Sequence, residues 1–264
     1  MLPSFILERP GSVAEAVRLL AEDSVGYCGG TELLLAMKMG LLRPSRLVDL
    51  KGLPELSRIE AADGELRIGA AVTHDAVARS PLVAEYAPFL AGVESRVGNA
   101  RVRAQGSIGG NLCFCEPRSD VTSALCALDG QVELLSGDGG TRLLPMGEFL
   151  LGAYWTARED NELLIRVRIP LPAPDGVYMK YQTSERPVVG IAAVREPAGE
   201  GLRLVVGAVT DTPVRYDVPA IGPVDVDGIV GGLEFTADLG GSEEYKRHVT
   251  AVYINRALMA LDTL

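Results

Sequence analysis

The segment from Gln105 to Leu112 constrains this 264-residue chain more than any other, because it reads Gln-Gly-Ser-Ile-Gly-Gly-Asn-Leu. Three glycines within five positions allow a backbone to bend tightly and to approach another group closely. Earlier in the chain, two more glycines, Gly29 and Gly30, precede the run Glu32 to Met39. We interpret the two segments as loops that hold one anionic ligand.

The first glycine segment along the chain, at Gly29 and Gly30, joins a strand to a helix in the predicted secondary structure. Val25 to Cys28 form a short apolar strand, and Glu32 to Met39 carry the leucines and methionines of a helix that stops at Gly40. Thr31 is a residue type that favours the N-cap. A helix start presents unpaired N–H groups and about half a positive charge, so a phosphate can bind there. The alternative is a tight connection without a ligand.

The first 55 residues are expected to form a strand-helix-strand-helix-strand unit. Around the glycine turn lie a strand at Phe5 to Leu7, a helix over residues 12–23 and a strand at Arg46 to Leu50. Ser12, followed three residues later by Glu15, is a capping box for the first helix.

Strand and helix patterns alternate in the middle of the chain. The strand-like run from Leu56 to Val72 precedes Thr73, which is expected to cap a short helix that ends at Pro81. His74, at the start of that helix, is interpreted as making an ordinary hydrogen bond rather than as catalytic. Residues 99–119 are expected to be a long irregular passage with a function. Further helices are predicted at Tyr86–Val97 and Asp120–Leu128, and strands at Val132–Leu135, Arg142–Leu144 and Leu163–Ile169.

Three prolines at positions 170, 172 and 174 mark the predicted domain boundary, because proline fits neither a helix interior nor a central strand. Beyond it we expect a three-stranded antiparallel sheet backed by one helix. The strands are predicted at Tyr178–Gln182, Val188–Arg195 and Leu202–Val209, and the helix at Glu243–Leu261. The sequence therefore predicts an α+β protein with two domains, 1–170 and 171–264.

Composition excludes several classes of function. The formal charge is −10 and no cluster of basic residues interrupts it, which disfavours nucleic acid and anionic membranes as partners. No apolar run approaches the roughly 18 residues of a membrane span. The first ten residues do not resemble a signal peptide, so we expect a cytoplasmic location.

The sequence also offers few residues that could form a metal site or a nucleophilic catalytic triad. The four cysteines are irregularly spaced and form no C-x-x-C pair, so neither a disulfide framework nor a zinc or iron–sulfur site is indicated. Two histidines leave little for a metal site or a Ser-His-Asp triad. The common nucleotide, hydrolase and metalloprotease motifs are missing as well.

The two glycine segments together resemble the FAD loops of the FAD-binding (medium) subunits of the molybdenum hydroxylase family, such as those of carbon monoxide and xanthine dehydrogenases. The first is Cys28–Leu33, and the second is Ser107–Leu112 followed by Pro117, Ser119 and Asp120. The similarity covers nearly the whole chain. Further matches in family order are Ile68–Ala70, Thr73–His74, Arg168–Pro170, Lys180–Tyr181 and, in the last helix, Tyr245, Arg247 and Arg256 to Leu258.

The resemblance implies a vanillyl-alcohol-oxidase-type (PCMH-type) FAD-binding fold over 1–170, with subdomains at about 1–55 and 56–170, and the family's small αβ domain over 171–264. FAD is expected to bind non-covalently. Amides of the first loop would hold its pyrophosphate, the second loop would meet the phosphates and ribityl chain, and Ser119 and Asp120 would reach the adenosine ribose. The implied cofactor-binding residues are Cys28, Gly29, Gly30, Thr31, Glu32, Leu33, Val97, Gly98, Gly106, Ser107, Gly109, Gly110, Asn111, Cys113, Phe114, Ser119, Asp120, Leu163, Leu164 and Lys180.

The chain departs from the family pattern at Cys28, Cys113 and Phe114. Relatives commonly carry alanine at positions 28 and 113 and histidine at 114. FAD binding is expected to tolerate these changes, because the loop contacts come mostly from the backbone. We interpret the cysteines as small buried apolar residues rather than as redox or metal groups.

The resemblance implies an electron-transfer subunit with no catalytic side chain of its own. A large partner would carry the molybdenum cofactor and a small partner the [2Fe-2S] clusters, in a heterotrimer or a dimer of heterotrimers. FAD on this chain would pass electrons to NAD, a quinone or oxygen. Two alternatives remain at this point: a self-contained flavoprotein reductase or oxidase of the same fold, and a flavin-free assembly subunit.

Overall fold

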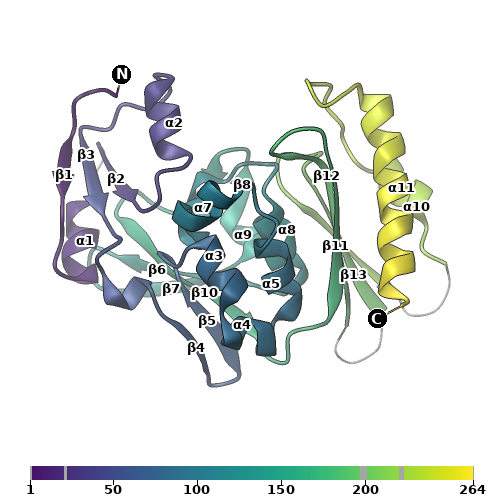
Figure 1. The fold of residues 1–264 in the computed structure, drawn as a ribbon, viewed down its shortest axis with the longest axis horizontal. Coiled ribbons are helices and arrows are strands. Elements are labelled where there is room, and N and C mark those ends of the chain that lie inside the picture. Colours follow the sequence, from purple (N-terminus) through teal and green to yellow (C-terminus); the bar gives the residue numbers. More distant parts are fainter. Residues whose placement is uncertain (1, 21–22, 197–200, 220–222, 264) are drawn as a thin grey trace.

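The structure is a computed structural model that describes residues 2–20, 23–196, 201–219 and 223–263. Figure 1 shows three groups of elements side by side along the longest axis of the molecule. The N-terminal group lies at one end, a larger group of sheet and helices occupies the middle, and the C-terminal sheet and its helix lie at the other end.

The N-terminal group is the strand-helix-strand-helix-strand unit that the sequence predicts. Its strands form a parallel sheet in the order β1-β3-β2. The Ser12 hydroxyl accepts from the Glu15 N–H, which confirms this cap. The first helix ends at Leu19 rather than at residue 23, and residues 21–22 lie outside the described chain. The elements are β1 (Ile6–Glu8), α1 (Val13–Leu19), β2 (Ser24–Tyr27), α2 (Leu33–Lys38) and β3 (Arg46–Asp49).

A five-stranded antiparallel sheet, in the order β4-β5-β10-β6-β7, forms the middle group. The predicted single strand from Leu56 to Val72 is a short 3-10 turn, η1, followed by a hairpin, because Asp63 and Gly64 both adopt left-handed conformations and reverse the chain. One face of the sheet is apolar and buried, through residues such as Leu66 and Val167. The elements are η1 (Pro54–Leu56), β4 (Ile59–Ala62), β5 (Glu65–Gly69), β6 (Gln131–Ser136), β7 (Thr141–Pro145) and β10 (Glu162–Pro170).

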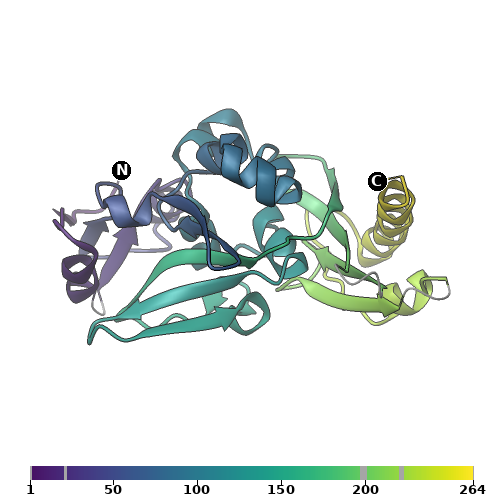
Figure 2. The ribbon, with the colours of Figure 1, turned by 90° about the horizontal axis from the view of Figure 1, so that it is seen from below.

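Short helices pack on the apolar face of this sheet, and those of residues 74–105 lie together on one side of it (Figure 2). The expected irregular passage over residues 99–119 is wrong in most of its length, because α6 and α7 occupy it. The predicted helix Tyr86–Val97 begins at Pro88. The elements are α3 (His74–Arg79), α4 (Pro81–Tyr86), α5 (Pro88–Glu94), α6 (Ala100–Gln105), α7 (Ile108–Phe114), α8 (Asp120–Ala127), α9 (Met146–Phe149), β8 (Leu150–Gly152) and β9 (Trp155–Thr156).

The C-terminal sheet has four strands, not three, in the order β11-β12-β13-β14. The additional strand β14 alternates half-buried and exposed residues, and two prolines, one before it and one at its end, obscure this pattern in the sequence. The predicted helix at Glu243–Leu261 is confirmed as α11 and packs on β11 and β12. The elements are β11 (Gly176–Gln182), β12 (Pro187–Arg195), β13 (Gly201–Gly207), β14 (Val214–Pro219), α10 (Val226–Gly231) and α11.

The middle group and the C-terminal sheet share one apolar core. Helix α8 packs against β12 and β13, on the face of the sheet opposite to α11 (Figure 1). Tyr178, Ala192 and Val205 from the C-terminal sheet belong to the same buried cluster as Leu66 and Leu125 from the middle group. This shared core holds the loops of the middle group in a fixed position relative to β11 and β12.

Candidate functional site

The two glycine segments of the sequence touch each other in the structure. A Cβ added at Gly29 would lie 1.8 Å from the Gln105 carbonyl oxygen and 2.8 Å from the Gly106 Cα. Only glycine permits this backbone-to-backbone approach. Gly30 adopts a left-handed conformation with φ of +67°, which again favours glycine. The pair Gly29-Gly30 is therefore required by the geometry of the turn.

The backbone N–H groups of the first glycine loop are free. None of the N–H groups of residues 29–33 donates a hydrogen bond to another described residue. The expected cap at Thr31 is wrong: Glu32 occupies the N-cap position with a helical backbone, and its side chain makes no capping bond. Because no side chain satisfies these donors, they are available to an anion at the start of α2.

The second glycine segment is not a loop but the first turn of α7, and its N–H groups are bonded. The Ser107 hydroxyl caps the helix by accepting from the Gly110 N–H at 3.2 Å. The N–H groups of Ile108 and Gly109 donate to the Val72 and Ala70 carbonyls at 3.0 and 2.9 Å. That of Asn111 donates to the Ser107 carbonyl at 2.9 Å.

Close packing explains Gly109, whereas Gly110 remains exposed. A Cβ at Gly109 would lie 2.6 Å from the Ala70 Cβ and 2.7 Å from the Ala70 carbonyl oxygen. A Cβ at Gly110 would meet only the Ser107 hydroxyl, at 2.9 Å. Of the two neighbouring glycines, the first joins α7 to the sheet, and the second leaves space at the surface.

Asp120 and Lys180, far apart in the sequence, form a buried ion pair of 2.7 Å between Nζ and Oδ2. The other carboxylate oxygen of Asp120 accepts from the Tyr178 hydroxyl at 2.7 Å. Burial, and then the charge of Asp120, raises the pKa of Tyr178 well above its usual value, so this phenol stays a donor. The structure thus places Lys180 in a cluster with Asp120 rather than in solvent.

Ser119 joins this cluster to α7, because its hydroxyl donates to the Asn111 side-chain oxygen at 2.7 Å. Ser119 also caps α8 by accepting from the Thr122 N–H. Three of the predicted site residues, Asn111, Ser119 and Asp120, therefore lie next to one another at the junction of α7 and α8.

Other predicted residues serve packing in the structure. Leu163 and Leu164 of β10 are buried in two different apolar clusters, so their side chains contact the core. Val97 is buried as well, whereas the adjacent Gly98 is exposed and left-handed, with φ of +44°. The Phe114 ring lies edge-on to that of Tyr154, with centroids 5.4 Å apart.

The cysteine thiols near the two segments are neutral. Burial raises the pKa of Cys113 to about 11. Burial also raises the pKa of Cys28, and the neighbouring Ser107 hydroxyl offsets part of this rise. Because the thiolate is the nucleophile, the raised pKa lowers the reactivity of these thiols near neutral pH.

No motif in the sequence includes Tyr178, Glu116 or Arg186, which contact the predicted site residues in the structure. Arg186 pairs with both Glu32 and Glu116. Tyr178 adjoins the predicted Lys180 in an alternating strand, so its position was recognisable. Arg186 lies in a turn with no motif, and no sequence signal indicated its partners.

His74 adjoins the second glycine segment, because its backbone N–H donates to the Gly106 carbonyl at 3.0 Å. His74 is buried and its Nδ1 lies 2.6 Å from the Glu94 Oε2, which agrees with the predicted structural hydrogen bond.

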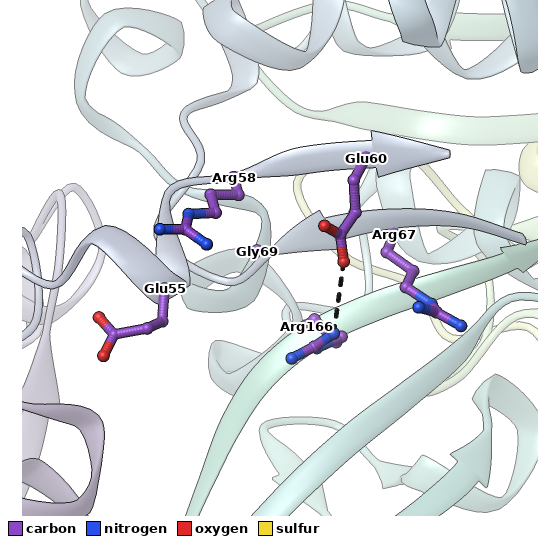
Figure 3. Close-up of a pocket in the computed structure, with 6 residues that line it drawn as sticks. All are labelled: Glu55, Arg58, Glu60, Arg67, Gly69 and Arg166. Carbon is purple, nitrogen blue, oxygen red and sulfur yellow. Dashed lines mark ion pairs between the residues drawn. The ribbon is translucent and has the colours of Figure 1, made fainter. Parts of the chain in front are cut away.

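A polar pocket on the five-stranded sheet is lined by Arg58, Arg67 and Arg166 together with Glu55, Glu60 and Gly69 (Figure 3). Arg166 lies 3.7 Å from Glu60 and Arg67 pairs with Asp63 and Glu65, and the pocket contains none of the predicted cofactor residues.

Residues 3–172 match the family model described as the FAD binding domain in molybdopterin dehydrogenase. The chain belongs to this family. It is an oxidoreductase subunit of the molybdenum hydroxylase type, and its N-terminal part is an FAD-binding domain of the predicted α+β class.

The curated relatives are similar in sequence to this FAD-binding subunit along nearly its whole length. It is 29% identical to the carbon monoxide dehydrogenase medium chain of Hydrogenophaga pseudoflava, over 98% of this chain and 97% of the relative. It is 28% identical to the nicotine 6-hydroxylase medium subunit of Paenarthrobacter nicotinovorans, over 98% of this chain and 97% of the relative.

Solved structures agree as well. The fold matches a chain of carbon monoxide dehydrogenase from Hydrogenophaga pseudoflava with a TM-score of 0.93 and 28% identity, covering 100% of this chain and 99% of that one. A chain of quinoline 2-oxidoreductase from Pseudomonas putida 86 matches with a TM-score of 0.90 and 27% identity, covering 99% and 98%.

FAD fits the free donors of the first glycine loop in this subunit. A pyrophosphate requires N–H donors and close approach to the backbone, and residues 29–33 offer both.

In the described ranges, no group of three or more His, Cys, Asp or Glu side chains could hold a metal ion. No helix within those ranges has the length and apolar character to span a membrane.

Proposed function

We propose that this chain binds FAD non-covalently, receives electrons from a partner iron–sulfur subunit and passes them to an external acceptor. The observation that carries the proposal is the set of free backbone N–H groups at residues 29–33, in a chain of the FAD-binding family. When bound, FAD supplies the redox chemistry. The task of the protein is to bind and orient it.

In the proposed arrangement the pyrophosphate lies against residues 29–33, because those N–H groups are unbonded. The exposed surface at Gly110 and Asn111 adjoins the phosphates and the ribityl chain. Asp120, with Ser119 and Lys180, accepts from or orients hydroxyl groups of the cofactor. Leu163 and Leu164 support the site through packing rather than through direct side-chain contact.

Partners are proposed from the relatives, several of which are medium chains or subunits by name. A large subunit with the molybdenum cofactor and a small subunit with [2Fe-2S] clusters would complete a heterotrimer or its dimer in the cytoplasm. The oxidation of the substrate is assigned to the large partner, as the resemblance to the family implies. The boundary near residue 170 between an FAD-binding domain and a C-terminal domain belongs to the same proposal.

A titration of the flavin-free chain with FAD tests the binding, with loss of flavin fluorescence as the measure. We expect one FAD per chain, and weaker binding by at least about tenfold for Gly30→Ala, because the added Cβ strains a left-handed turn by about 1–2 kcal/mol and changes the path of the free N–H groups. Gly64→Ala is the matched control, since Gly64 is also left-handed, with φ of +75°, but has an open surrounding. A wild-type chain that purifies without flavin and takes up none would indicate a flavin-free assembly subunit.

Electron transfer needs a separate test. The FAD-loaded chain is mixed with the reduced iron–sulfur partner, and the absorbance of the flavin is followed. Bleaching by the partner, together with no turnover of organic substrates by the isolated chain, is the expected result. Turnover by the isolated chain would favour the self-contained reductase or oxidase.

A further inference from the structure

The turn between β11 and β12, residues 183–186, contacts three separate parts of the proposed FAD site. The Glu185 carboxylate accepts from the Asn99 side-chain amide at 2.9 Å, next to Gly98. Arg186 reaches the first glycine loop and the α7–α8 connection. In β11, two residues before the end of this strand, Lys180 holds Asp120. One hairpin therefore joins segments that are distant in the sequence.

Arg186 makes the longest of these connections. Its Nη2 donates to both Glu32 oxygens, at 2.8 and 2.7 Å, across 154 positions of sequence. Its Nη1 donates to the Glu116 Oε2. Glu32 is the N-cap residue of α2, so Arg186 binds directly beside the free N–H groups of the first glycine loop.

Glu116 is a rigid anchor for Arg186. Its side chain is only 8% exposed and also accepts from the Tyr154 hydroxyl at 2.8 Å and from the Arg118 Nε at 3.0 Å. Tyr154 has a left-handed backbone, and its N–H donates to the carbonyl of Cys115, another left-handed residue. Such strained residues persist only where the surroundings fix them.

Apart from Glu185 and Arg186, little fixes the tip of the hairpin. Residues 182–185 are exposed, and the tip is absent from the apolar clusters of the described residues. Polar contacts of this kind break more readily than buried apolar ones, because water and salt compete for them. The tip can therefore open while the rest of the sheet remains packed.

Charge explains why an arginine is needed at this position. The Glu32 carboxylate lies beside the N–H groups that would receive a pyrophosphate, and two negative charges repel each other. Arg186 offsets the charge of Glu32 at the edge of the loop, while its other partner, Glu116, also pairs with Arg118. Without it, the loop would keep its donors but carry an uncompensated carboxylate.

We propose that Arg186 is a positioning residue that closes the β11–β12 hairpin over the FAD site and sets the residence time of FAD. This inference rests on the proposed function, since it concerns the same site. It predicts that loss of Arg186 accelerates the release of FAD more than it slows binding.

Stopped-flow fluorescence of FAD binding and release tests this role in the full chain. Arg186→Met is expected to release FAD about tenfold faster or more, whereas Arg186→Lys keeps the charge and gives a smaller change. Glu32→Gln in the Arg186→Met background should restore part of the residence time, because it removes the uncompensated charge. Arg195→Met, at the far end of β12, is the matched control, and it should leave the release rate unchanged, because Arg195 contacts Leu261 and Asp262 at the end of α11.

Amide hydrogen exchange gives a second measurement that does not depend on FAD. In the flavin-free Arg186→Met chain, residues 182–186 should exchange faster while the amides of β13 keep their rates. If wild type binds FAD and Arg186→Met releases it at the wild-type rate, the role of Arg186 is overturned and the proposed function stands. If wild type binds no FAD, both are overturned.

Discussion

The two glycine segments look alike in the sequence but differ in what their backbones do. In the first, the N–H groups of residues 29–33 donate to no other residue that the structure describes. The second, residues 105–112, uses Ser107 and the carbonyls of Ala70 and Val72 to satisfy those of α7. Glycine at position 29 permits contact between the two segments, and glycine at position 109 permits contact between α7 and the sheet.

This difference teaches that glycine content alone does not identify a binding loop. The first segment offers hydrogen-bond donors to a ligand, whereas the second supports the first and presents a small exposed surface at Gly110. Cofactor affinity should therefore be most sensitive in the first segment. Folding stability should be most sensitive where the second segment meets its neighbours.

The largest effect is expected for Gly29→Ala, because the new Cβ would overlap the Gln105 carbonyl at 1.8 Å and force the two segments apart. We expect a loss of more than about 3 kcal/mol in the free energy of unfolding, as for severe overpacking of a core. FAD binding should be lost in the same variant. Urea unfolding and FAD titration measure the two effects, and Gly52→Ala, where a Cβ has open space, is the control. A stable Gly29→Ala chain with normal FAD affinity would refute the contact between the segments.

The second-largest effect is expected for Gly109→Ala, which should lower the free energy of unfolding by about 1–3 kcal/mol because the new Cβ overlaps Ala70. FAD affinity of the folded fraction should change little, since Gly109 is buried and its N–H is already bonded. Chemical unfolding followed by circular dichroism checks the stability. Gly92→Ala in α5, where a Cβ meets nothing, is the matched helical control. A fall in FAD affinity without loss of stability would place the cofactor against Gly109 itself.

Gly110→Ala, one residue further along α7, is expected to lower FAD affinity with little effect on stability. Stability should change by less than about 1 kcal/mol, because alanine favours a helix but the new Cβ lies 2.9 Å from the Ser107 hydroxyl that caps α7. FAD affinity should fall by about tenfold if the exposed surface at Gly110 adjoins the phosphates, a loss of about 1.4 kcal/mol. Isothermal titration calorimetry measures the affinity. An unchanged dissociation constant would remove Gly110 from the site and leave the first segment as the main contact.

Much of the fold was predictable, because capping residues and apolar periodicity are local signals. Ser12 and Thr73 cap helices as predicted, and α11 has the predicted bounds. Helix α7 was missed because glycines disfavour a helix, and its tertiary contacts with Ala70 and Val72 outweigh that preference. Thr31 was predicted to cap α2, but Glu32 occupies this position.

The site was predictable where it follows a motif and hidden where it depends on tertiary contacts. The family resemblance indicated the glycine pair at 29–30, Asp120 and Lys180 as single residues, but it did not indicate the ion pair between Asp120 and Lys180. The connection from Arg186 to Glu32 spans 154 positions, so no local pattern encodes it. For the same reason the free and bonded N–H groups of the two segments could not be distinguished before the structure.

The smallest effect is expected for Cys113→Ala, which replaces a departure from the family pattern by the residue that relatives commonly carry. The Cys113 thiol is neutral, with a pKa raised to about 11 by burial, so its removal takes no charge from the site. We expect FAD affinity within about threefold of wild type, which is less than 1 kcal/mol. Alkylation of Cys113 in the wild-type chain should be slow at pH 7 and accelerate as the pH rises toward 11, because only the thiolate reacts. Mass spectrometry of peptides from the alkylated chain checks the rate. Rapid alkylation at pH 7, or a large loss of FAD affinity in Cys113→Ala, would show that the side chain at the end of α7 contributes to the cofactor site, and the two segments would then differ less than their backbones indicate.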